Sequence, residues 1–525
     1  MPTDRVKARI VLTMNTIAFT VCFSAWMMNG VLITFLIEKH VFVWDKAQIG
    51  WLIGIPVLTG SIIRLPVGVA TDKYGGRVVY TIVMLLSAVP MYLVSFANDF
   101  TFFFLTGLGF GLAGTSFAVG IAYTSVWFER KHQGTALGIF GAGNAGAALT
   151  SVGAPMLLAY FTADGANLEG WRLLPRFYAA MLVAMALVFY VATFSKKVEV
   201  GAGKTLAQRL TPLRDIRVWR FGFYYFIVFG GFVALAQWLV PYYVGAYALS
   251  IGLAGLLAAV FSFPSGVIRV LGGWMSDRWG ARKVMYWVLS GVTVCCLLLA
   301  VPRMDLFAPG EGVMAEAAGA VGSVTSERIV VGERSYALRL RPEAIANDDG
   351  QTLVWPRRAF WHEPVAKEGE RVAKRQLLAR GVTHIFFQAN RGIFTGIALL
   401  LAVFMGIGMA AVYKHIPTYF PKDVGVVGGI VGVLGGLGGF FFPILFGYLL
   451  QGTGIWTTCW LFFFGLAVAC LVWMHLVIQR LMAQGAPQYA REMETTPELA
   501  RQMEDLAREM EGLAEKLRKP ARGAA

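Results

Sequence analysis

Two arginines, Arg64 and Arg269, lie inside long apolar stretches of the chain. No residue from Gln48 to Ile63 carries a charge, and the next charged residue after Arg64 is Asp72, eight positions later. Eight residues of helix span about 12 Å, which would place this guanidinium deep in a bilayer. Because an arginine at that depth costs about 2.5–3.5 kcal/mol on insertion scales, the sequence indicates that the charge has a function.

Both arginines belong to copies of one pattern. The first copy, Ser61–Arg77, reads SIIRLPVGVATDKYGGR, and the second, Gly266–Arg282, reads GVIRVLGGWMSDRWGAR. In each copy the arginine precedes an aspartate by eight residues, and a basic residue, an aromatic residue, a glycine and a second arginine follow. An intramembrane charge repeated at a fixed distance from a loop motif implies a duplicated six-helix half.

Paired arginines that face a central cavity would make a site for a small anion. Guanidinium is planar, permanently charged and carries a fork of N–H donors, which suits a flat oxyanion with two oxygens in one plane. Snorkelling or a structural ion pair is the alternative, but no acidic residue lies near the middle of any predicted span. The cysteines show neither metal-ligand spacing nor a disulfide framework, so we predict no metal and no cofactor; they are Cys22, Cys295, Cys296, Cys459 and Cys470.

The composition is that of a protein that crosses a membrane many times. Of the 525 residues, 57% are hydrophobic and 15% are charged, whereas soluble proteins carry about a quarter charged residues. Apolar stretches of about 20 residues recur, each long enough to cross a hydrocarbon core about 30 Å thick. We predict an all-α polytopic membrane protein with twelve transmembrane helices, at 10–37, 47–71, 77–97, 101–128, 135–161, 176–195, 221–247, 250–276, 284–302, 392–419, 424–451 and 454–479.

Lysine and arginine gather in alternate loops between these spans. They are Arg5, Lys7 and Arg9; Lys73 and Arg77; Arg130 and Lys131; the basic residues of 196–220; and Arg278, Arg282 and Lys283. By the positive-inside rule, both termini are cytoplasmic, and the expected location is the bacterial inner membrane. Membrane topology therefore accounts for the net charge of +15, and we predict no nucleic-acid partner.

The spans and the repeat divide the chain into five parts. They are an N-terminal six-helix bundle (1–195), a cytoplasmic linker (196–220), a C-terminal six-helix bundle (221–479) interrupted by a periplasmic insert (303–391), and a cytoplasmic helical tail (480–525). The insert contains alternating stretches such as RIVV and YALRL, which predict a small β-rich module or an ordered spacer. Apolar residues of the tail step by four and three, as in a heptad seam: Leu499, Met503, Leu506, Met510, Leu513 and Leu517. The sequence identifies no partner for the insert or the tail.

Two segments, Gly134–Pro155 and Gly425–Pro443, are rich in glycine. Such spacing of small residues favours close helix packing. Glycine also lets a backbone approach a ligand closely and lets a helix bend. Asn144, inside the first segment, has both donor and acceptor groups that could contact an uncharged face of an anion.

These residues also carry a resemblance to a known family. The twin arginine segments, TSFAVGIAYTSVWFERKHQGTALGIFGAGNAG, and GIGMAAVYKHIPTYFPKDVG with the glycine run after it resemble the nitrate/nitrite porter (NarK-type) family of the major facilitator superfamily. The resemblance implies two pseudo-symmetric six-helix bundles, and transport of nitrate and nitrite by alternating access rather than enzyme activity. It does not extend to the periplasmic insert.

The resemblance also implies roles for particular residues. Arg64 and Arg269 would clamp the anion from the two halves, and the other implied substrate-binding residues are Asn144, Tyr225, Phe229, Phe117 and Phe23. Taken alone, each of these aromatic residues is more typical of a helix core, and only Tyr225 brings a hydroxyl donor. The glycines expected to flex are Gly141, Gly143, Gly146, Gly432, Gly435 and Gly436. Asp72, Arg77, Asp277 and Arg282 are expected to latch the outward-open form.

The charges in the cavity bear on the mode of transport. Two uncompensated arginines predict obligatory exchange of nitrate for nitrite, because an empty carrier would reorient poorly. Lys414 and His415 are interpreted as an interfacial pair at the periplasmic or cavity rim; a Lys414 that faced the cavity would add a third cation and could titrate, as nitrate/proton symport requires. Two further alternatives are an exchanger of small carboxylates such as formate or oxalate, and a sensor or scaffold whose insert binds a partner.

Overall fold

The computed structural model describes residues 4–128, 130–196, 211–300, 303–341, 357–388, 391–420 and 424–483. The chain divides into two compact units. A helical unit comprises Met1–Cys296 and Ala398–Ala525, and a smaller unit comprises Leu297–Ile397. The predicted heptad residues of the tail and most of the predicted linker lie outside the described residues.

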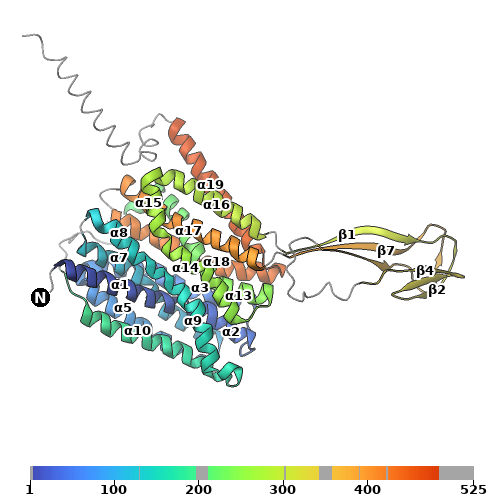
Figure 1. Cartoon of the computed structure of the whole chain (residues 1–525), viewed down its shortest axis with the longest axis horizontal. Coiled ribbons are helices and arrows are strands. Elements are labelled where there is room, and N and C mark those ends of the chain that lie inside the picture. Colours follow the sequence, from blue (N-terminus) through green and yellow to red (C-terminus); the bar gives the residue numbers. More distant parts are fainter. Residues whose placement is uncertain are drawn as a thin grey trace, which may run out of the picture. The chain divides into compact units, whose positions relative to one another are not determined.

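The first half of the helical unit runs from α1 to α10. Its α-helices are α1 (Asp4–Trp26), α2 (Met28–Glu38), α3 (Lys46–Ile62), α4 (Arg64–Tyr74), α5 (Gly76–Leu93), α6 (Phe100–Phe110), α7 (Ser116–Trp127), α8 (Arg130–Gly141), α9 (Gly146–Phe161) and α10 (Leu173–Ala192). Short 3₁₀ turns connect several of them, including η2 (Gly111–Thr115) and η3 (Ala142–Ala145). Figure 1 shows these helices running side by side.

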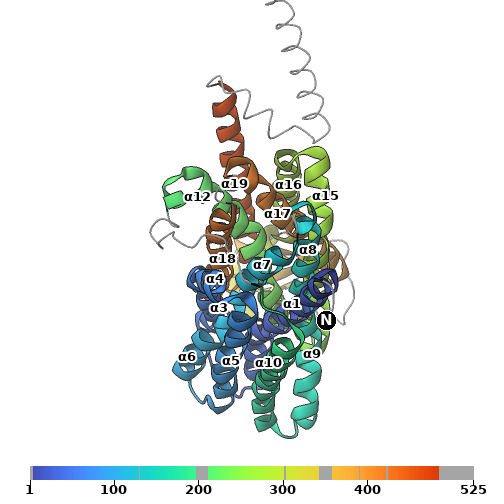
Figure 2. The same ribbon diagram turned by 90° about the vertical axis from the view of Figure 1, so that its left-hand side faces the viewer.

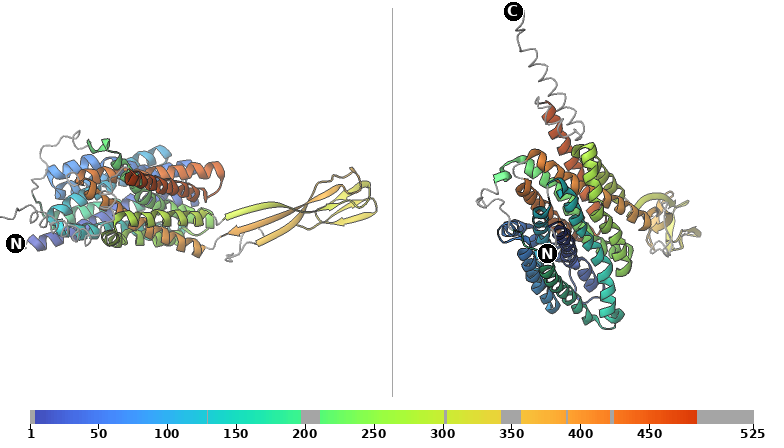
Figure 3. Two further views of the ribbon diagram at one scale, coloured as in Figure 1. Left: turned by 90° about the horizontal axis from the view of Figure 1, so that it is seen from above. Right: turned by 60° about the vertical axis from the view of Figure 1, so that its left-hand side comes forward.

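The second half of the helical unit runs from α12 to α19. It contains α12 (Ile216–Tyr225), a π-helical turn η7 (Phe226–Gly230), α13 (Gly231–Tyr247), α14 (Ile251–Val267), α15 (Arg269–Trp279), α16 (Ala281–Ala300), α17 (Arg391–Tyr419), α18 (Val424–Thr453) and α19 (Thr458–Ala483). Helices α3 and α18 pack against each other across the two halves (Figure 2). In Figure 3 the blue and teal helices of the first half pack beside the green, orange and red helices of the second.

The helices are interrupted where the sequence places its candidate site residues. The chain bends by 40° between α3 and α4 and by 43° between α14 and α15, and Arg64 and Arg269 are the first residues after these bends. Pro66 lies in the first turn of α4 and Pro264 in the last turn of α14, and proline removes a backbone donor from a helix. Asn144 lies in the 3₁₀ turn η3. The two bends and the 3₁₀ turn therefore coincide with the polar side chains that lie within the apolar bundle.

The helices are long and apolar enough to cross a membrane repeatedly. Among the described residues, nine helical segments pass this test, or eleven when each bent pair counts as one span. The predicted span 135–161 is not one of them; it is present as α8, η3 and α9, which the turn at Ala142–Ala145 divides. The helical unit is therefore a multi-pass membrane structure.

The smaller unit consists of antiparallel strands. One sheet has the order β1 (Arg303–Met314), β7 (Leu377–Gln388), β5 (Arg357–Pro364). The other has the order β4 (Arg334–Ala337), β3 (Arg328–Val331), β2 (Gly319–Val324), β6 (Arg371–Val372). The stretch RIVV forms β3, and Gly332, at φ 60°, turns the chain into β4. Alternate residues bury a small core that includes Val321, Ile329 and Leu378.

Candidate substrate-binding site

Arg64 is a buried cation in the middle of the helical unit. Only 3% of the residue is exposed. Its Nε donates to the Gly114 carbonyl at 3.3 Å, and its Nη1 donates to the Gly432 carbonyl of α18 at 3.0 Å. Its Nη2 is buried without a hydrogen-bond partner among the described residues. One N–H edge of this guanidinium is therefore left for a ligand.

Three aromatic rings surround the Arg64 guanidinium. Its Cζ lies 5.7 Å from the ring centroid of Trp26, 5.4 Å from that of Phe117 and 5.5 Å from that of Phe229. Cation–π contacts of this kind partly replace the hydration that a buried guanidinium loses. The rings also narrow the space beside the charge, which favours a small ligand.

Arg269 approaches the same place from the second half. Its Cζ lies 5.7 Å from the ring centroid of Phe117, so both guanidiniums lie against one phenylalanine. Its Nη2 donates to the Tyr225 hydroxyl at 3.5 Å, and its Nη1 is buried without a hydrogen-bond partner in the described part of the chain. The structure thus brings together two arginines that are about two hundred positions apart in the sequence.

Tyr225 joins Arg269 to an aromatic wall. The Tyr225 ring stacks on Phe229 with centroids 4.9 Å apart, and Tyr413 meets it edge-on at 5.0 Å. The Tyr413 hydroxyl donates to the Gly428 carbonyl at 3.0 Å. Sequence reasoning missed Tyr413 and Trp26. Tyr413 lies in the segment GIGMAAVYKHIPTYF, directly before Lys414, but nothing in its spacing distinguishes it from a core tyrosine.

Asn144 is fully buried and neither its Nδ2 nor its Oδ1 has a hydrogen-bond partner among the described residues. Its turn packs against α14, since a methyl group added at Gly266 would lie 3.4 Å from Asn144 Cβ. An unsatisfied buried amide costs about 1–3 kcal/mol. A group kept at that cost is suited to a ligand that contacts it during transport.

Phe23 lies one ring farther from the charges than Phe117 does. It packs edge-on against Trp26 at 5.5 Å and stacks beside Phe232 at 6.5 Å. Phe117 in turn contacts Phe229 at 6.0 Å. Phe117 and Phe229 therefore lie directly beside the guanidiniums, whereas Phe23 packs against Trp26, the third ring beside Arg64.

The site carries positive charge without a compensating carboxylate. Within the described part of the chain, neither Arg64 nor Arg269 forms an ion pair, and their partners are carbonyl oxygens, a hydroxyl group and aromatic faces. Buried charges usually pair with a counter-charge. The arrangement can therefore bind a small planar anion between the halves.

Comparisons with known proteins identify the family of the chain. Residues 15–325 match the family model described as Major Facilitator Superfamily. The chain is 38% identical over 495 residues to the "Probable nitrate/nitrite antiporter NarK1" of Thermus thermophilus, covering 94% of this chain and 96% of the relative. It is 25% identical over 475 residues to the "Nitrite extrusion protein" of Bacillus subtilis, covering 89% and 95%.

The chain belongs to the NarK-type nitrate/nitrite porter family of the major facilitator superfamily. Solved structures share its fold at low sequence identity. A bacterial homologue of the human lysosomal transporter Spinster, in an inward-facing and occupied conformation, matches with a TM-score of 0.59, at 14% identity, covering 94% of this chain and 99% of that one. The E. coli fucose:proton symporter FucP matches with a TM-score of 0.54, at 13% identity, covering 90% and 99%.

The glycines of this NarK-type porter allow close contacts around the arginines. A methyl group at Gly435 would lie 2.1 Å from the Tyr225 ring, and one at Gly436 would lie 2.4 Å from Ser61 Oγ. Gly432 supplies the carbonyl that accepts from Arg64. Replacing Gly435 or Gly436 would therefore displace site residues, whatever part these glycines play in bending α18.

The glycines of the first half differ among themselves. A methyl group at Gly143 would lie 2.5 Å from the Phe19 ring, and one at Gly146 would lie 2.3 Å from the Thr20 carbonyl oxygen. At Gly141 the nearest atom would be Arg269 Nη1, at an ordinary 3.8 Å. Gly143 and Gly146 thus fit α9 and its turn against α1, whereas Gly141 leaves room beside the second arginine.

Two residues of the loop motifs, Arg77 and Asp277, make contacts within their own half of the helical unit. Arg77 Nε donates to the Tyr190 carbonyl at 2.8 Å, and its Cζ lies 4.3 Å from the Tyr190 ring centroid, which links α5 to the end of α10. Asp277 forms an ion pair with Lys414. Asp72 lies in the last turn of α4, and Arg282 is buried at the start of α16.

The positions of Lys414 and His415 differ from the expected periplasmic or cavity rim. Helix α17 begins at the end of the bundle opposite the loop motifs. Residue 414 lies near the C-terminal end of α17 and therefore beside the last turn of α15. The Lys414 ammonium therefore binds the Asp277 carboxylate instead of adding a third cation to the cavity. His415 is buried and stacks on Phe221, with centroids 5.5 Å apart.

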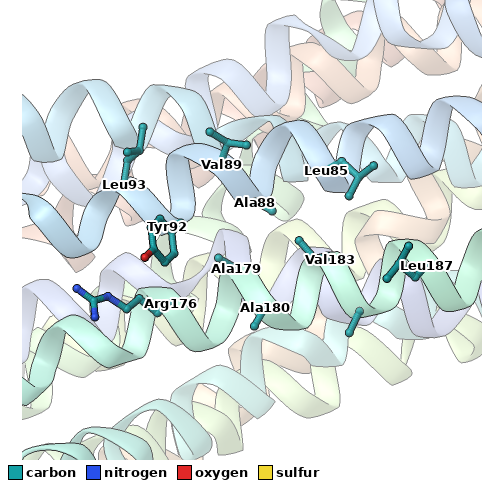
Figure 4. A pocket seen from close by; sticks show the side chains of 11 residues that line it. Leu85, Ala88, Val89, Tyr92, Leu93, Arg176, Ala179, Ala180, Val183 and Leu187 are labelled. Carbon is teal, nitrogen blue, oxygen red and sulfur yellow. The ribbon is translucent and has the colours of Figure 1, made fainter.

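A groove between α5 and α10 lies apart from the site. Figure 4 shows its lining of alanine, valine and leucine side chains, with Tyr92 and Arg176 near one end. Arg176 Nε donates to Ser95 Oγ at 3.1 Å. The exposed apolar side chains of the groove, Val89 and Leu187 among them, suit contact with lipid rather than with an inorganic anion.

Proposed function

We propose that this chain exchanges nitrate for nitrite across the bacterial inner membrane by alternating access. The names of its relatives support this substrate pair. The observation that carries the proposal is that Arg64 and Arg269 both lie against Phe117, each with an N–H group that has no hydrogen-bond partner among the residues described. A flat anion placed between them would accept hydrogen bonds from both halves at once.

The charges explain why the exchange is obligatory. Arg64 belongs to the first half and Arg269 to the second, and the second must approach the first when the site closes. Without an anion the two positive charges repel each other in surroundings of low dielectric constant. Bound nitrate or nitrite removes part of that repulsion, so the loaded carrier reorients and the empty carrier does not.

The packing supports an inward-facing state. Near the end opposite the loop motifs, the halves meet closely: a methyl group at Gly255 would lie 2.0 Å from the Ser151 carbonyl oxygen, and one at Gly50 would lie 2.3 Å from that of Pro443. Four residues beyond each arginine, on the side of the loop motifs, a methyl group at Gly68 or Gly273 would meet no atom within 4 Å. The site would therefore open towards the loop motifs, which we place in the cytoplasm.

The proposed topology completes this assignment. It has twelve spans in two six-helix bundles, at 1–195 and 221–479, joined by a cytoplasmic linker at 196–220. The strands between α16 and α17 form a periplasmic insert at 303–391, and 480–525 form a cytoplasmic tail. Both termini are cytoplasmic, as the alternation of lysine and arginine between loops favours.

Exchange is favoured over proton symport by the groups around the site. No carboxylate among the described residues contacts either guanidinium, and Lys414 is engaged by Asp277. The rings within 6 Å of the Arg64 Cζ also favour a three- or four-atom anion over a larger carboxylate such as oxalate.

The test is nitrate uptake into proteoliposomes at clamped pH. Internal nitrite should accelerate uptake, and an imposed proton gradient without internal anion should not drive it. Competition by oxalate should be weak beside competition by nitrite. Uptake that follows the proton gradient and ignores internal nitrite would contradict exchange.

A further inference from the structure

The groove between α5 and α10 has the shape of a channel (Figure 4). Its volume is about 860 Å³, within the range of about 300–1,000 Å³ that small-molecule sites occupy. Ala88 of α5 and Ala179 of α10 are buried and form its floor, whereas Val89 and Leu187 are exposed and form its rims. Small side chains below larger ones leave room for an extended apolar chain.

The groove is as long as one leaflet of a bilayer is deep. On α10 its lining runs from Arg176 to Leu187, eleven positions later, which corresponds to about 16 Å of helix. One leaflet contributes about 15 Å, which is half of a hydrocarbon core about 30 Å thick. The lining residues of α10 recur at intervals of three and four, so a single face of the helix follows the groove.

Aromatic rings surround the charged end of this groove. The Arg176 Cζ lies 5.8 Å from the ring centroid of Tyr92 and 5.5 Å from that of Phe96, and both rings are about half exposed. Tyrosine is enriched where hydrocarbon meets the lipid head groups. Helix α5 begins at Gly76, beside the first loop motif, so this end of the groove lies at the opposite side of the membrane. In the proposed topology that side is the periplasmic one.

Arg176 keeps hydrogen-bond donors that its surroundings do not use. Its Nε donates to Ser95 Oγ at 3.1 Å, while among the described residues neither Nη1 nor Nη2 donates to an acceptor and no carboxylate pairs with the residue. Arg172, one turn earlier, is engaged on every nitrogen: its Nε binds Glu169, its Nη1 a backbone carbonyl and its Nη2 the Asn98 side chain. Arg172 therefore holds the loop together, and Arg176 presents a charged edge to a ligand.

A cation at one end of an apolar channel one leaflet deep matches the two parts of a phospholipid. We propose that the groove binds one anionic phospholipid of the periplasmic leaflet, phosphatidylglycerol for instance. Its phosphate accepts hydrogen bonds from the Nη groups of Arg176, and one acyl chain lies along the alanine floor. Free phosphate would leave the apolar lining uncovered, so the occupant needs a chain as well as a charge.

This inference concerns lipid binding and goes beyond nitrate exchange. Only the choice of leaflet rests on the proposed topology. Because the lipid would contact α5 and α10 together, it should stabilise the packing of the first half.

The first test counts the lipids that the purified full-length protein retains in a neutral detergent, by native mass spectrometry. The wild type should retain one phosphatidylglycerol in preference to phosphatidylcholine. Arg176→Gln should weaken the phosphatidylglycerol affinity about tenfold, because charge-assisted hydrogen bonds are lost. Arg176→Lys should retain the lipid, since an ammonium group also binds phosphate. Equal affinities for the two lipids, or an unchanged affinity in Arg176→Gln, would overturn the proposal.

A second variant tests the channel without altering the charge. Ala180→Phe places a ring in the groove at an exposed position of α10, so it leaves the packed core intact. The phosphatidylglycerol affinity should again fall about tenfold. Val188→Phe, at a 53% exposed position of the same helix outside the groove, is the matched control and should bind like the wild type. Equal affinities of these two variants would contradict the proposed path of the acyl chain.

A third measurement locates the lipid on the wild-type chain. Phosphatidylglycerol with a photoreactive group on its acyl chain is incorporated into phosphatidylcholine vesicles that contain the protein. After illumination, peptides from 85–93 and 176–187 should carry several-fold more label than other lipid-facing helices. Unlabelled phosphatidylglycerol should displace this label. Labelling that is spread evenly over the lipid-facing helices would overturn the proposal.

Discussion

Arg64 and Arg269 occupy equivalent positions in the two repeats, yet their surroundings differ. Each starts a helix after a bend, of 40° in one case and 43° in the other. Arg64 is buried, donates to two carbonyls and lies against three rings. Arg269 is half-buried, donates to the Tyr225 hydroxyl at 3.5 Å and lies against one ring.

The difference indicates a division of labour between repeated residues. Arg64 is fixed by its neighbours, and we propose that it presents a constant charge to the anion. Arg269 has fewer contacts, so its side chain can follow the movement of the second half. Under this proposal the two duplicated arginines are identical, and the packing around them makes Arg64 the fixed contact for the anion and Arg269 the mobile one.

The largest effect is expected for Arg64→Lys. An ammonium group cannot make both carbonyl bonds and still present a planar donor edge, so nitrate uptake should fall by about a hundredfold or more. Initial uptake rates in proteoliposomes measure this loss. Arg176→Lys, at the outer groove, is the matched control and should transport like the wild type. If Arg64→Lys kept uptake within threefold of the wild type, Arg64 would not be the fixed contact for the anion.

Arg269→Lys should have a smaller effect of a different kind. Its single long hydrogen bond can be remade by a flexible ammonium group, so uptake should fall by roughly tenfold. The loss should appear in the nitrate affinity as well as in the exchange rate, because Arg269 would contact the anion and also act during closure. A loss as large as that of Arg64→Lys would make the two arginines equivalent and break the comparison.

Sequence reasoning identified both arginines because a charge inside an apolar span is a local signal. It also placed Tyr225, Phe117 and Phe229 through family resemblance. It could not separate the roles of the two arginines, because the carbonyls that bind Arg64 come from helices distant in the sequence. Such contacts depend on how the helices pack.

Two other differences have similar physical causes. Lys414 was expected near the periplasmic or cavity rim, but the direction of α17 carries it to the loop motif, where Asp277 binds it. In the sequence, nothing distinguishes Trp26 and Tyr413 from aromatic residues of a helix core. Only the packing of the helices brings Trp26 to Arg64 and Tyr413 to Tyr225. These two residues can therefore be recognised as neighbours of the site only from the structure.

Tyr225→Phe should test whether Arg269 depends on its hydrogen-bond partner in α12. It removes the hydroxyl that accepts from Arg269 and preserves the stacking on Phe229, so the KM for nitrate should rise about fivefold. Concentration series of uptake measure it, and Tyr160→Phe, at an exposed position, is the control. An unchanged KM would mean that Arg269 needs no partner from α12.

The smallest effect is expected at the Asp277–Lys414 ion pair. Both side chains are about half exposed, and such pairs contribute about 1 kcal/mol or less. Lys414→Met should therefore change the exchange rate by less than about fivefold and leave the KM for nitrate unchanged. A large rise in KM would instead place Lys414 at the substrate.

The central claim is that one anion is held by both arginines. Nitrate titration calorimetry on the wild type, Arg64→Lys, Arg269→Lys and the double variant tests it most directly. The account predicts one nitrate per chain and a loss of affinity in the double variant that is well below the product of the two single losses, because both changes remove the same ligand's contacts. Two nitrates per chain, or losses that multiply independently, would contradict it.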